Sequence, residues 1–165
     1  MSAGDNNSNV DPMALAEGTI TFELDGTKVI TTEGSAGMDG TSTYSIGNIW
    51  VDVNGTGIIT RNLGLTVFAV EQIKPQSYEL VWDDCFLNTS IPCGFFLYNT
   101  DEPEIPGWYQ TQSSDTFVKI DFQELGVAPG EKVVGTFQAR ATNLGGAASD
   151  RHNITNGAFN LVIQE

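Results

Sequence analysis

Two cysteines are the most chemically specific residues of the chain. Cys85 and Cys93 are separated by seven residues, in a loop-like stretch that contains Asn88 and Pro92. A structural zinc site needs four ligands, and neither a C-x₂-C spacing nor a nearby histidine is present. The even cysteine count and the flanking sequence favour a local disulfide, as found in oxidising compartments, over two separate buried thiols.

Acidic residues gather in the same part of the chain, because no base lies between Lys74 and Lys119. Loop carboxylates are the ligands that Ca²⁺ prefers, so two acidic loops that meet at one end of the fold predict a calcium site. The spacing of these acids matches no EF-hand motif, and a solvated acidic rim explains them without any cofactor. The candidate ligands are Asp83, Asp84, Asp101, Glu102 and Glu104.

Aromatic residues flank the cysteine and acidic loops. Exposed tryptophan and tyrosine rings can stack on sugars, so the aromatics predict a carbohydrate or peptide groove, although such rings are more often core. The neighbours Phe95 and Phe96 point to opposite faces of any strand, as do Trp108 and Tyr109. One ring of each pair therefore leaves the main core. The candidate contact residues are Trp82, Tyr98, Trp108 and Tyr109.

A catalytic centre is not indicated. The only histidine, His152, lies in a polar run typical of a hairpin tip, and Ser-His-Asp chemistry needs a histidine base. No nucleophile elbow, zinc-protease motif or nucleotide-binding loop is present. A glycosidase needs only two suitably placed carboxylates and no motif, so a carbohydrate-active hydrolase is kept as the third hypothesis.

The elements that position these residues are strands. Ile20, Phe22 and Leu24 alternate with polar residues, and Asp25-Gly26 predicts a type I′ turn into a second strand. Similar segments recur at spacings of about 8–12 residues to the C-terminus, the pattern of a sandwich or barrel. We therefore predict an all-β antiparallel β-sandwich, Ig-like or jelly-roll-like, with about nine to ten strands and little or no helix.

Three details of this strand pattern are specific enough to test. A Gly/Ser loop is predicted over Glu33–Thr41. A long strand over Thr43–Val53 changes its alternation at Gly47-Asn48, where a β-bulge would restore the core face. Two short strands, Ile58–Arg61 and Leu65–Val70, are predicted on either side of Asn62-Leu63-Gly64.

The N-terminal stretch differs in composition from the rest. Residues 1–17 carry three acids and no base, and we predict an acidic tail or tether there, followed by one sandwich domain over 18–165. Asp11 and Pro12 could cap and begin a single helical turn. No signal or lipid anchor is visible in this sequence, and the disulfide favours one that has been removed.

Length and charge limit the classes of function. The 165 residues hold 21 acids and 7 bases, which gives a formal charge of −14. That balance argues against nucleic-acid binding through clustered Lys and Arg. No apolar run reaches the ~18 residues of a transmembrane segment. The hydrophobic fraction of 40% suits a folded domain.

The C-terminal hairpin resembles a known group of proteins. Residues 133–142 contain Gly135-Thr136-Phe137, and residues 153–161 contain Ile154-Thr155-Asn156-Gly157 followed by Phe159. These motifs resemble small β-sandwich lipoproteins of unknown function from Bacteroidetes-type bacteria. The resemblance implies export, an N-terminal lipid anchor and a cell-surface or periplasmic site.

The sequence therefore predicts a non-enzymatic extracellular, cell-surface or periplasmic sandwich that acts in binding or adhesion, with a surface glycan or a protein as partner. The alternative is a structural subunit of a surface filament or virion. Such a subunit would self-assemble through its N-terminal segment and sheet edges.

Overall fold

The computed structural model describes residues 10–39, 43–51, 59–69, 73–87, 92–100, 104–147 and 150–164. Eleven strands and two short helices form within these residues. The strands are β1 (Thr19–Leu24), β2 (Thr27–Thr31), β3 (Ser35–Asp39), β4 (Thr43–Val51), β5 (Ile59–Phe68), β6 (Ser77–Leu80), β7 (Cys93–Thr100), β8 (Gly107–Gln110), β9 (Phe117–Leu125), β10 (Lys132–Asn143) and β11 (His152–Val162). The helices are η1 (Pro12–Ala14), a 3-10 helix, and α1 (Asp84–Leu87).

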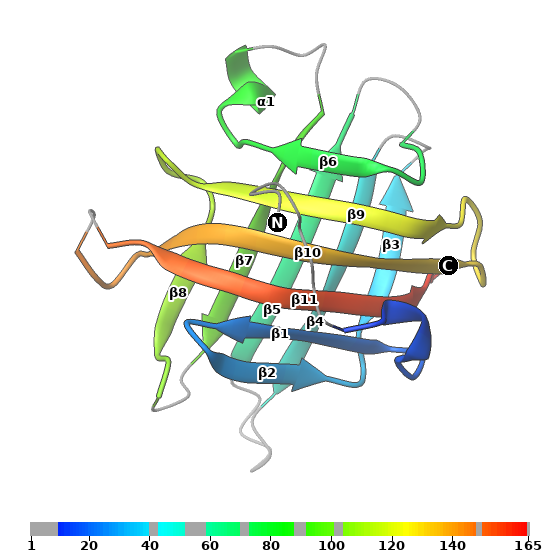
Figure 1. Ribbon diagram of the computed structural model, residues 1–165, viewed down its shortest axis with the longest axis horizontal. Coiled ribbons are helices and arrows are strands. Elements are labelled where there is room, and N and C mark those ends of the chain that lie inside the picture. Colours follow the sequence, from blue (N-terminus) through cyan, green and yellow to red (C-terminus); the bar gives the residue numbers. More distant parts are fainter. Residues whose placement is uncertain are drawn as a thin grey trace.

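The strands form two layers that cross steeply (Figure 1). The front layer has the order β6-β9-β10-β11-β1-β2, and the back layer has the order β8-β7-β5-β4-β3. Every pair of named strands is antiparallel. The predicted all-β antiparallel sandwich is confirmed.

Strand β10 joins the two layers. Its first two thirds pair with β9, from Val133 to Arg140, and its end pairs with β8 through Thr142 and Asn143. A strand that passes from one sheet to the other makes the corner of an orthogonally packed sandwich. The sheet is not closed into a barrel.

The core lies between the two layers and is rich in aromatic rings. Phe22 of β1 and Phe137 of β10 come from the front layer and contact Phe96 of β7 in the back layer, with ring centroids 5.7 and 6.0 Å apart. Phe159 of β11 lies 6.2 Å from Phe137. All four side chains are buried. Edge-on and tilted ring pairs of this kind contribute about 0.5–1.5 kcal/mol each beyond the area they bury.

The first predicted turn is confirmed. Asp25 and Gly26 both have positive φ, 49° and 88°, as a type I′ turn requires. The two-residue loop leaves Leu24 directly opposite Thr27, and this fixes the register of β1 against β2.

The region from Glu33 to Phe68 differs from the prediction. A strand, β3, replaces the expected loop, because residues 35–39 pair with β4 in unbroken register and Ala36 is buried against the core. The strand was not predicted, because the glycine and serine residues in this segment give no alternation of hydrophobic and polar side chains. With β3 the described residues form eleven strands, more than the nine to ten expected.

Two further predictions in this region are wrong. The register between β4 and β5 passes through Gly47 and Asn48 without a shift, and the bulge lies between Trp50 and Val51 instead. Strand β5 is continuous where two short strands were expected, because Leu63 and Leu65 both face the core with Gly64 between them. A glycine on the outer face of a strand does not end it.

The helix η1 lies against β10 and β11. Asp11 caps η1 by accepting a hydrogen bond from the Met13 backbone N–H at 3.0 Å, as predicted, and Pro12 is buried. The Asn160 side chain donates to the Leu15 carbonyl at 3.0 Å. Residues 1–9 lie outside the described part of the chain, and the boundary between tail and domain at residue 17 stays a prediction. No helix among the described residues is long and apolar enough to cross a membrane.

Candidate functional site

The predicted disulfide is present. Cys85, in α1, is bonded to Cys93, the first residue of β7, with the two Cα atoms 5.4 Å apart. The bond fixes α1 to the start of a back-layer strand. Closing so short a loop stabilises the fold by about 2–3 kcal/mol in the chain-entropy view. The disulfide is consistent with a location outside the cytoplasm.

An aromatic cluster lies on the outer face of the back layer, next to the disulfide. Trp82 packs edge-on against Phe95, with ring centroids 5.2 Å apart, and Phe68 lies 6.4 Å from Phe95 on the neighbouring strand. Phe96, the next residue, is fully buried on the inner face. Phe95 and Phe96 therefore face opposite sides, as predicted.

Trp108 extends the apolar character of this face to β8. Its side chain is 44% exposed, whereas Tyr109 is 4% exposed and faces the core. Asn99 lies directly opposite Trp108 in register, so the two residues share the outer face. The prediction that one ring of this pair leaves the core is confirmed.

The Asn143 side chain helps to hold the backbone that carries Trp108. Asn143 accepts hydrogen bonds from the backbone N–H groups of Trp108 and Gly145, at 3.3 and 3.0 Å, and donates to the Pro106 carbonyl at 3.2 Å. Gly107 adopts a φ of 135°, and a Cβ there would overlap the Asn143 side chain. The backbone of the exposed tryptophan is thus held in place.

We call the outer face of β5, β7 and β8 the neutral face, because none of its described side chains is charged. The strand registers pair Thr66 with Phe95 and Gly64 with Leu97, which places them on the same side as Trp108. The neutral face consists of Gly64, Thr66, Phe68, Phe95, Leu97, Asn99, Trp108 and Gln110.

Tyr98 and Tyr109 are core residues, unlike the two tryptophans. Tyr98 is 1% exposed and packs edge-on against Phe22, with centroids 5.2 Å apart. The Tyr109 hydroxyl donates to the Pro106 carbonyl at 3.3 Å. Burial, and next the negative charge of Asp25, raise the pKa of Tyr109 above its ordinary value. Neither ring is available for stacking on the surface.

The predicted calcium ligands are not brought together where the structure describes them. Asp83 and Asp84 lie beside the disulfide at the start of β7, and Glu104 follows the other end of that strand. Eight extended residues separate these ends by roughly 20 Å. Asp101 and Glu102 lie outside the described residues, within which no three His, Cys, Asp or Glu side chains could hold a metal ion together. The calcium site stays a prediction.

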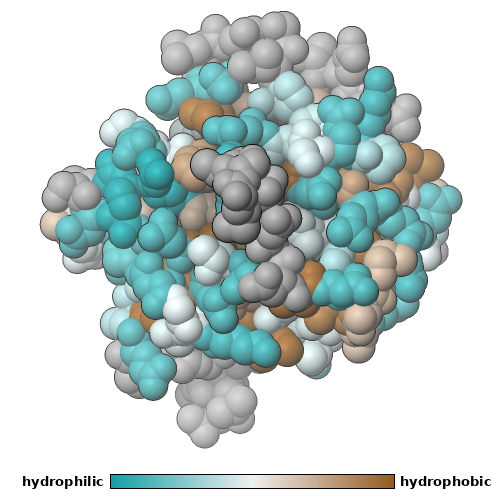
Figure 2. Space-filling model, in the orientation of Figure 1, coloured by the Kyte–Doolittle hydropathy of each residue, from teal (hydrophilic) through white to brown (hydrophobic). Residues whose placement is uncertain are grey.

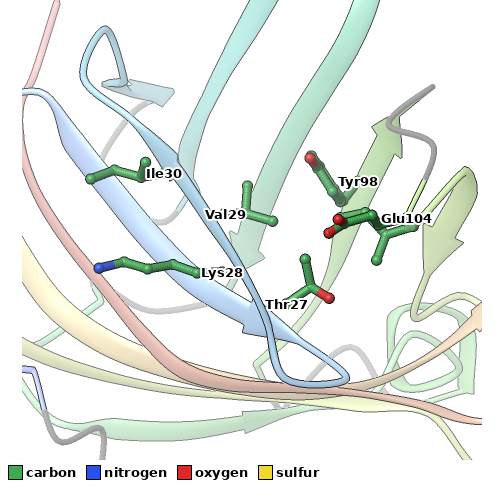
Figure 3. Close-up of a pocket in the computed structure, with 7 residues that line it drawn as sticks. Thr27, Lys28, Val29, Ile30, Tyr98 and Glu104 are labelled. Atoms are coloured by element: carbon green, nitrogen blue, oxygen red, sulfur yellow. The ribbon is translucent and has the colours of Figure 1, made fainter.

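A cavity of about 200 Å³ opens beside β2, near Glu104 (Figure 3). Thr27, Val29 and the Glu104 carboxylate point toward a shared space, and Tyr98 lies at its back. The Lys28 and Ile30 side chains point away from it. The lining residues are Thr27, Lys28, Val29, Ile30, Tyr98, Glu104 and Ile105.

His152 is paired with Asp25, 127 residues away in sequence. Its Nδ1 lies 2.7 Å from Oδ2 of Asp25, and Oδ1 of Asp25 accepts a hydrogen bond from the Asn153 backbone at 2.8 Å. The imidazole also packs edge-on against Tyr109. Among the described residues no hydroxyl or thiol is hydrogen-bonded to His152, so this pair joins the β1–β2 turn to β11.

Sequence reasoning missed both this pair and the cavity. Nothing in the spacing of these residues signals that Asp25 meets His152 or that Glu104 shares a cavity with β2. No family model matches the chain, and neither a curated protein nor a solved structure is significantly similar to it.

Proposed function

We propose that this protein is a non-enzymatic module for binding or adhesion, and that the neutral face is its contact surface. The observation that carries the proposal is the exposed Trp108 ring, which stands on a hydrogen-bonded backbone on an uncharged face of a chain with a net charge of −14. Large exposed rings without charged neighbours are typical of contact surfaces.

The rigidity of the site supports this function. A residue whose backbone is already held loses little backbone freedom on binding, so more of the contact energy appears as affinity. Leu144 is exposed beside Trp108, and its backbone N–H donates to the Trp108 carbonyl at 2.9 Å. An uncharged surface of rings and amides suits a glycan or a neutral protein patch, because neither partner has to desolvate a charge.

A location on the cell surface, in the periplasm or outside the cell is part of the proposal. The disulfide supports it, because such bonds persist in oxidising compartments. Membership of the Bacteroidetes-type lipoprotein group, with its lipid anchor, is likewise proposed from the C-terminal motifs.

The experiment compares two exposed apolar residues. Trp108→Ala is screened on a glycan array and on a panel of surface proteins beside Val127→Ala, whose side chain is equally exposed, at 46%, in the turn between β9 and β10. We expect Trp108→Ala to weaken binding at least about tenfold and Val127→Ala to leave it unchanged. Equal binding by both variants would place the contact surface elsewhere.

The second candidate is a structural subunit that assembles through sheet edges. It is favoured by the edge strand β2, which carries Ile30 at 52% exposure and pairs with β1 alone among the described residues. Sedimentation of the full chain and of a chain without residues 1–9 tests it. Oligomers that dissociate on this deletion would support assembly, and a monomer in both cases would contradict it.

Bound calcium and hydrolysis are tested separately. A melting temperature that falls in excess chelator would support the calcium prediction, and an unchanged one would contradict it. Release of reducing sugar from a bound glycan would support the third hypothesis of a hydrolase.

A further inference from the structure

Among the described residues, the outer edge of β2 pairs with no other strand. Because Asp25 and Gly26 form a two-residue turn, Thr27 and Val29 exchange their backbone hydrogen bonds with β1. The alternation of an antiparallel ladder then points the N–H and C=O groups of Lys28 and Ile30 away from β1. Such an edge can accept a further strand.

The cavity lies directly beside these groups. Lys28 and Ile30 line it although their side chains point elsewhere, as expected if their backbone faces it (Figure 3). Its volume of about 200 Å³ is smaller than the roughly 300–1,000 Å³ of a site for a drug-sized ligand. The cavity therefore suits a single side chain.

The lining specifies the chemistry of that side chain. Val29 and Ile105 supply aliphatic walls, and the Glu104 carboxylate points into the opening. Among the described residues Glu104 has no hydrogen bond or ion pair, and the nearby Lys28 is turned away from it. Aliphatic walls with one carboxylate complement an ammonium group on an alkyl stem, which is a lysine side chain.

The charge distribution of the chain favours the same occupant. The net charge is −14, and no base occurs between Lys74 and Lys119, a window that includes Glu104. A field of this sign attracts cations and raises their association rate. The chain's own N-terminal stretch fits poorly, because residues 1–17 hold three acids and no base.

We propose that β2 and this cavity form a docking site for an extended, lysine-bearing segment of a partner protein. The segment pairs with the free edge of β2 and places its lysine ammonium against Glu104. This is strand addition, in which backbone hydrogen bonds give affinity and a side-chain pocket gives specificity. The site is separate from the neutral face and does not depend on the function proposed for it.

The first test uses pentylammonium as a probe for the lysine side chain, with pentanoate as the probe of opposite charge. In backbone amide NMR we expect saturable shifts at Lys28, Ile30 and Ile105 with pentylammonium only. Glu104→Gln should weaken this binding at least about tenfold. The matched control Glu124→Gln, on β9, should not. Equal shifts with pentanoate, or an unaffected Glu104→Gln, would overturn the charge assignment.

The second test asks whether the lysine arrives on a strand. A blocked five-residue peptide with a central lysine between valines and threonines is compared with its glutamate counterpart and with a backbone N-methylated form. We expect the lysine peptide to bind at least about tenfold more tightly than pentylammonium and than either other peptide. Equal affinity of the peptide and pentylammonium would overturn strand addition. Trp108→Ala should leave both titrations unchanged, so loss of the proposed neutral-face function would be recognised separately.

Discussion

The two layers of the sandwich have similar inner faces and different outer faces. In β9 the buried Val118, Ile120 and Phe122 alternate with Lys119 and Asp121, and the front of the molecule is mainly hydrophilic (Figure 2). In β7 the buried residues include Phe96 and Tyr98, and the outward residues are Phe95, Leu97 and Asn99.

This difference shows which strand positions are not constrained by core packing and can therefore be used for function. The inner positions of both strands must be apolar, because they share one core. The outer positions have no such constraint, and on the front layer they carry charge, for example the Lys119–Glu79 pair at 3.9 Å. Their uncharged, aromatic counterparts on the back layer need another explanation, and the partner contact that we propose would provide one.

The largest expected effect separates the two faces of β7. Phe96→Ala removes a buried ring that contacts Phe22 and Phe137, and should lower the free energy of unfolding by about 3–5 kcal/mol. Phe95→Ala removes a partly exposed ring and should cost only about 1–2 kcal/mol. Urea denaturation measures both. Equal losses would mean that the neutral face is packed as a second core.

The next effect concerns the disulfide that fixes α1 beside the neutral face. Replacing Cys85 and Cys93 by serine should lower the free energy of unfolding by about 2–3 kcal/mol, because the unfolded chain regains the freedom of the loop. Trp82 should then cover Phe95 less well, which its fluorescence would report. Unchanged stability and emission would show that α1 is held by other contacts.

A smaller effect distinguishes the inner and outer residues of β8. Because the pKa of Tyr109 is raised in the folded protein, the tyrosine hydroxyl loses its proton first in the unfolded chain, near pH 10. The contribution of the neutral hydroxyl to the free energy of unfolding is therefore complete below that pH. The contribution falls as the pH rises toward the folded pKa. Stability should therefore drop more steeply above about pH 10 in the natural protein than in Tyr109→Phe.

The same pH dependence of stability can be measured for Trp108, the outward neighbour of Tyr109. Trp108→Ala should keep the alkaline loss of stability, because Trp108 carries no titrating group and contacts solvent. Parallel denaturation curves at about pH 8 and pH 11 measure all three proteins. Identical pH dependence in Tyr109→Phe and the natural protein would contradict the role given to Tyr109.

The smallest effect lies on the charged front layer. Glu79→Gln removes one partner of an ion pair whose glutamate side chain is 60% exposed. Such pairs contribute between about 0 and 1 kcal/mol, and salt screens them. Denaturation in low and high salt should show a loss within that range that disappears at high salt. A larger, salt-independent loss would mean that the front face also has a packing role.

Local patterns alone predicted much of the fold. Alternation at Ile20, Phe22 and Leu24 indicated a strand, and the Asp25-Gly26 pair specified the turn that follows. The short spacing of Cys85 and Cys93 indicated the disulfide. These features depend on neighbours in sequence, where the side-chain period and the positive φ of glycine decide the outcome.

Hydrophobic alternation did not predict the strands whose residues are mostly small or polar. Strand β3 contains Ser35 and Gly37 and is recognisable only from its pairing with β4. Strand β5 contains Gly64, and a glycine between two apolar residues predicted a turn there. The structure shows instead that Leu63 and Leu65 are both buried in the core on one continuous strand. Backbone hydrogen bonds to the neighbouring strands hold these segments extended, although their side chains do not predict a strand.

The sequence by itself determined that this is an antiparallel all-β protein, with a local disulfide and an uneven distribution of charge. Only the tertiary structure decided that Trp108 faces solvent while Tyr98 and Tyr109 are core, and that Asp25 meets His152. The same holds for the cavity that Glu104 shares with β2. The physical reason is that a period of two assigns residues to two faces, whereas the packing of distant strands decides which face is buried and which ends meet.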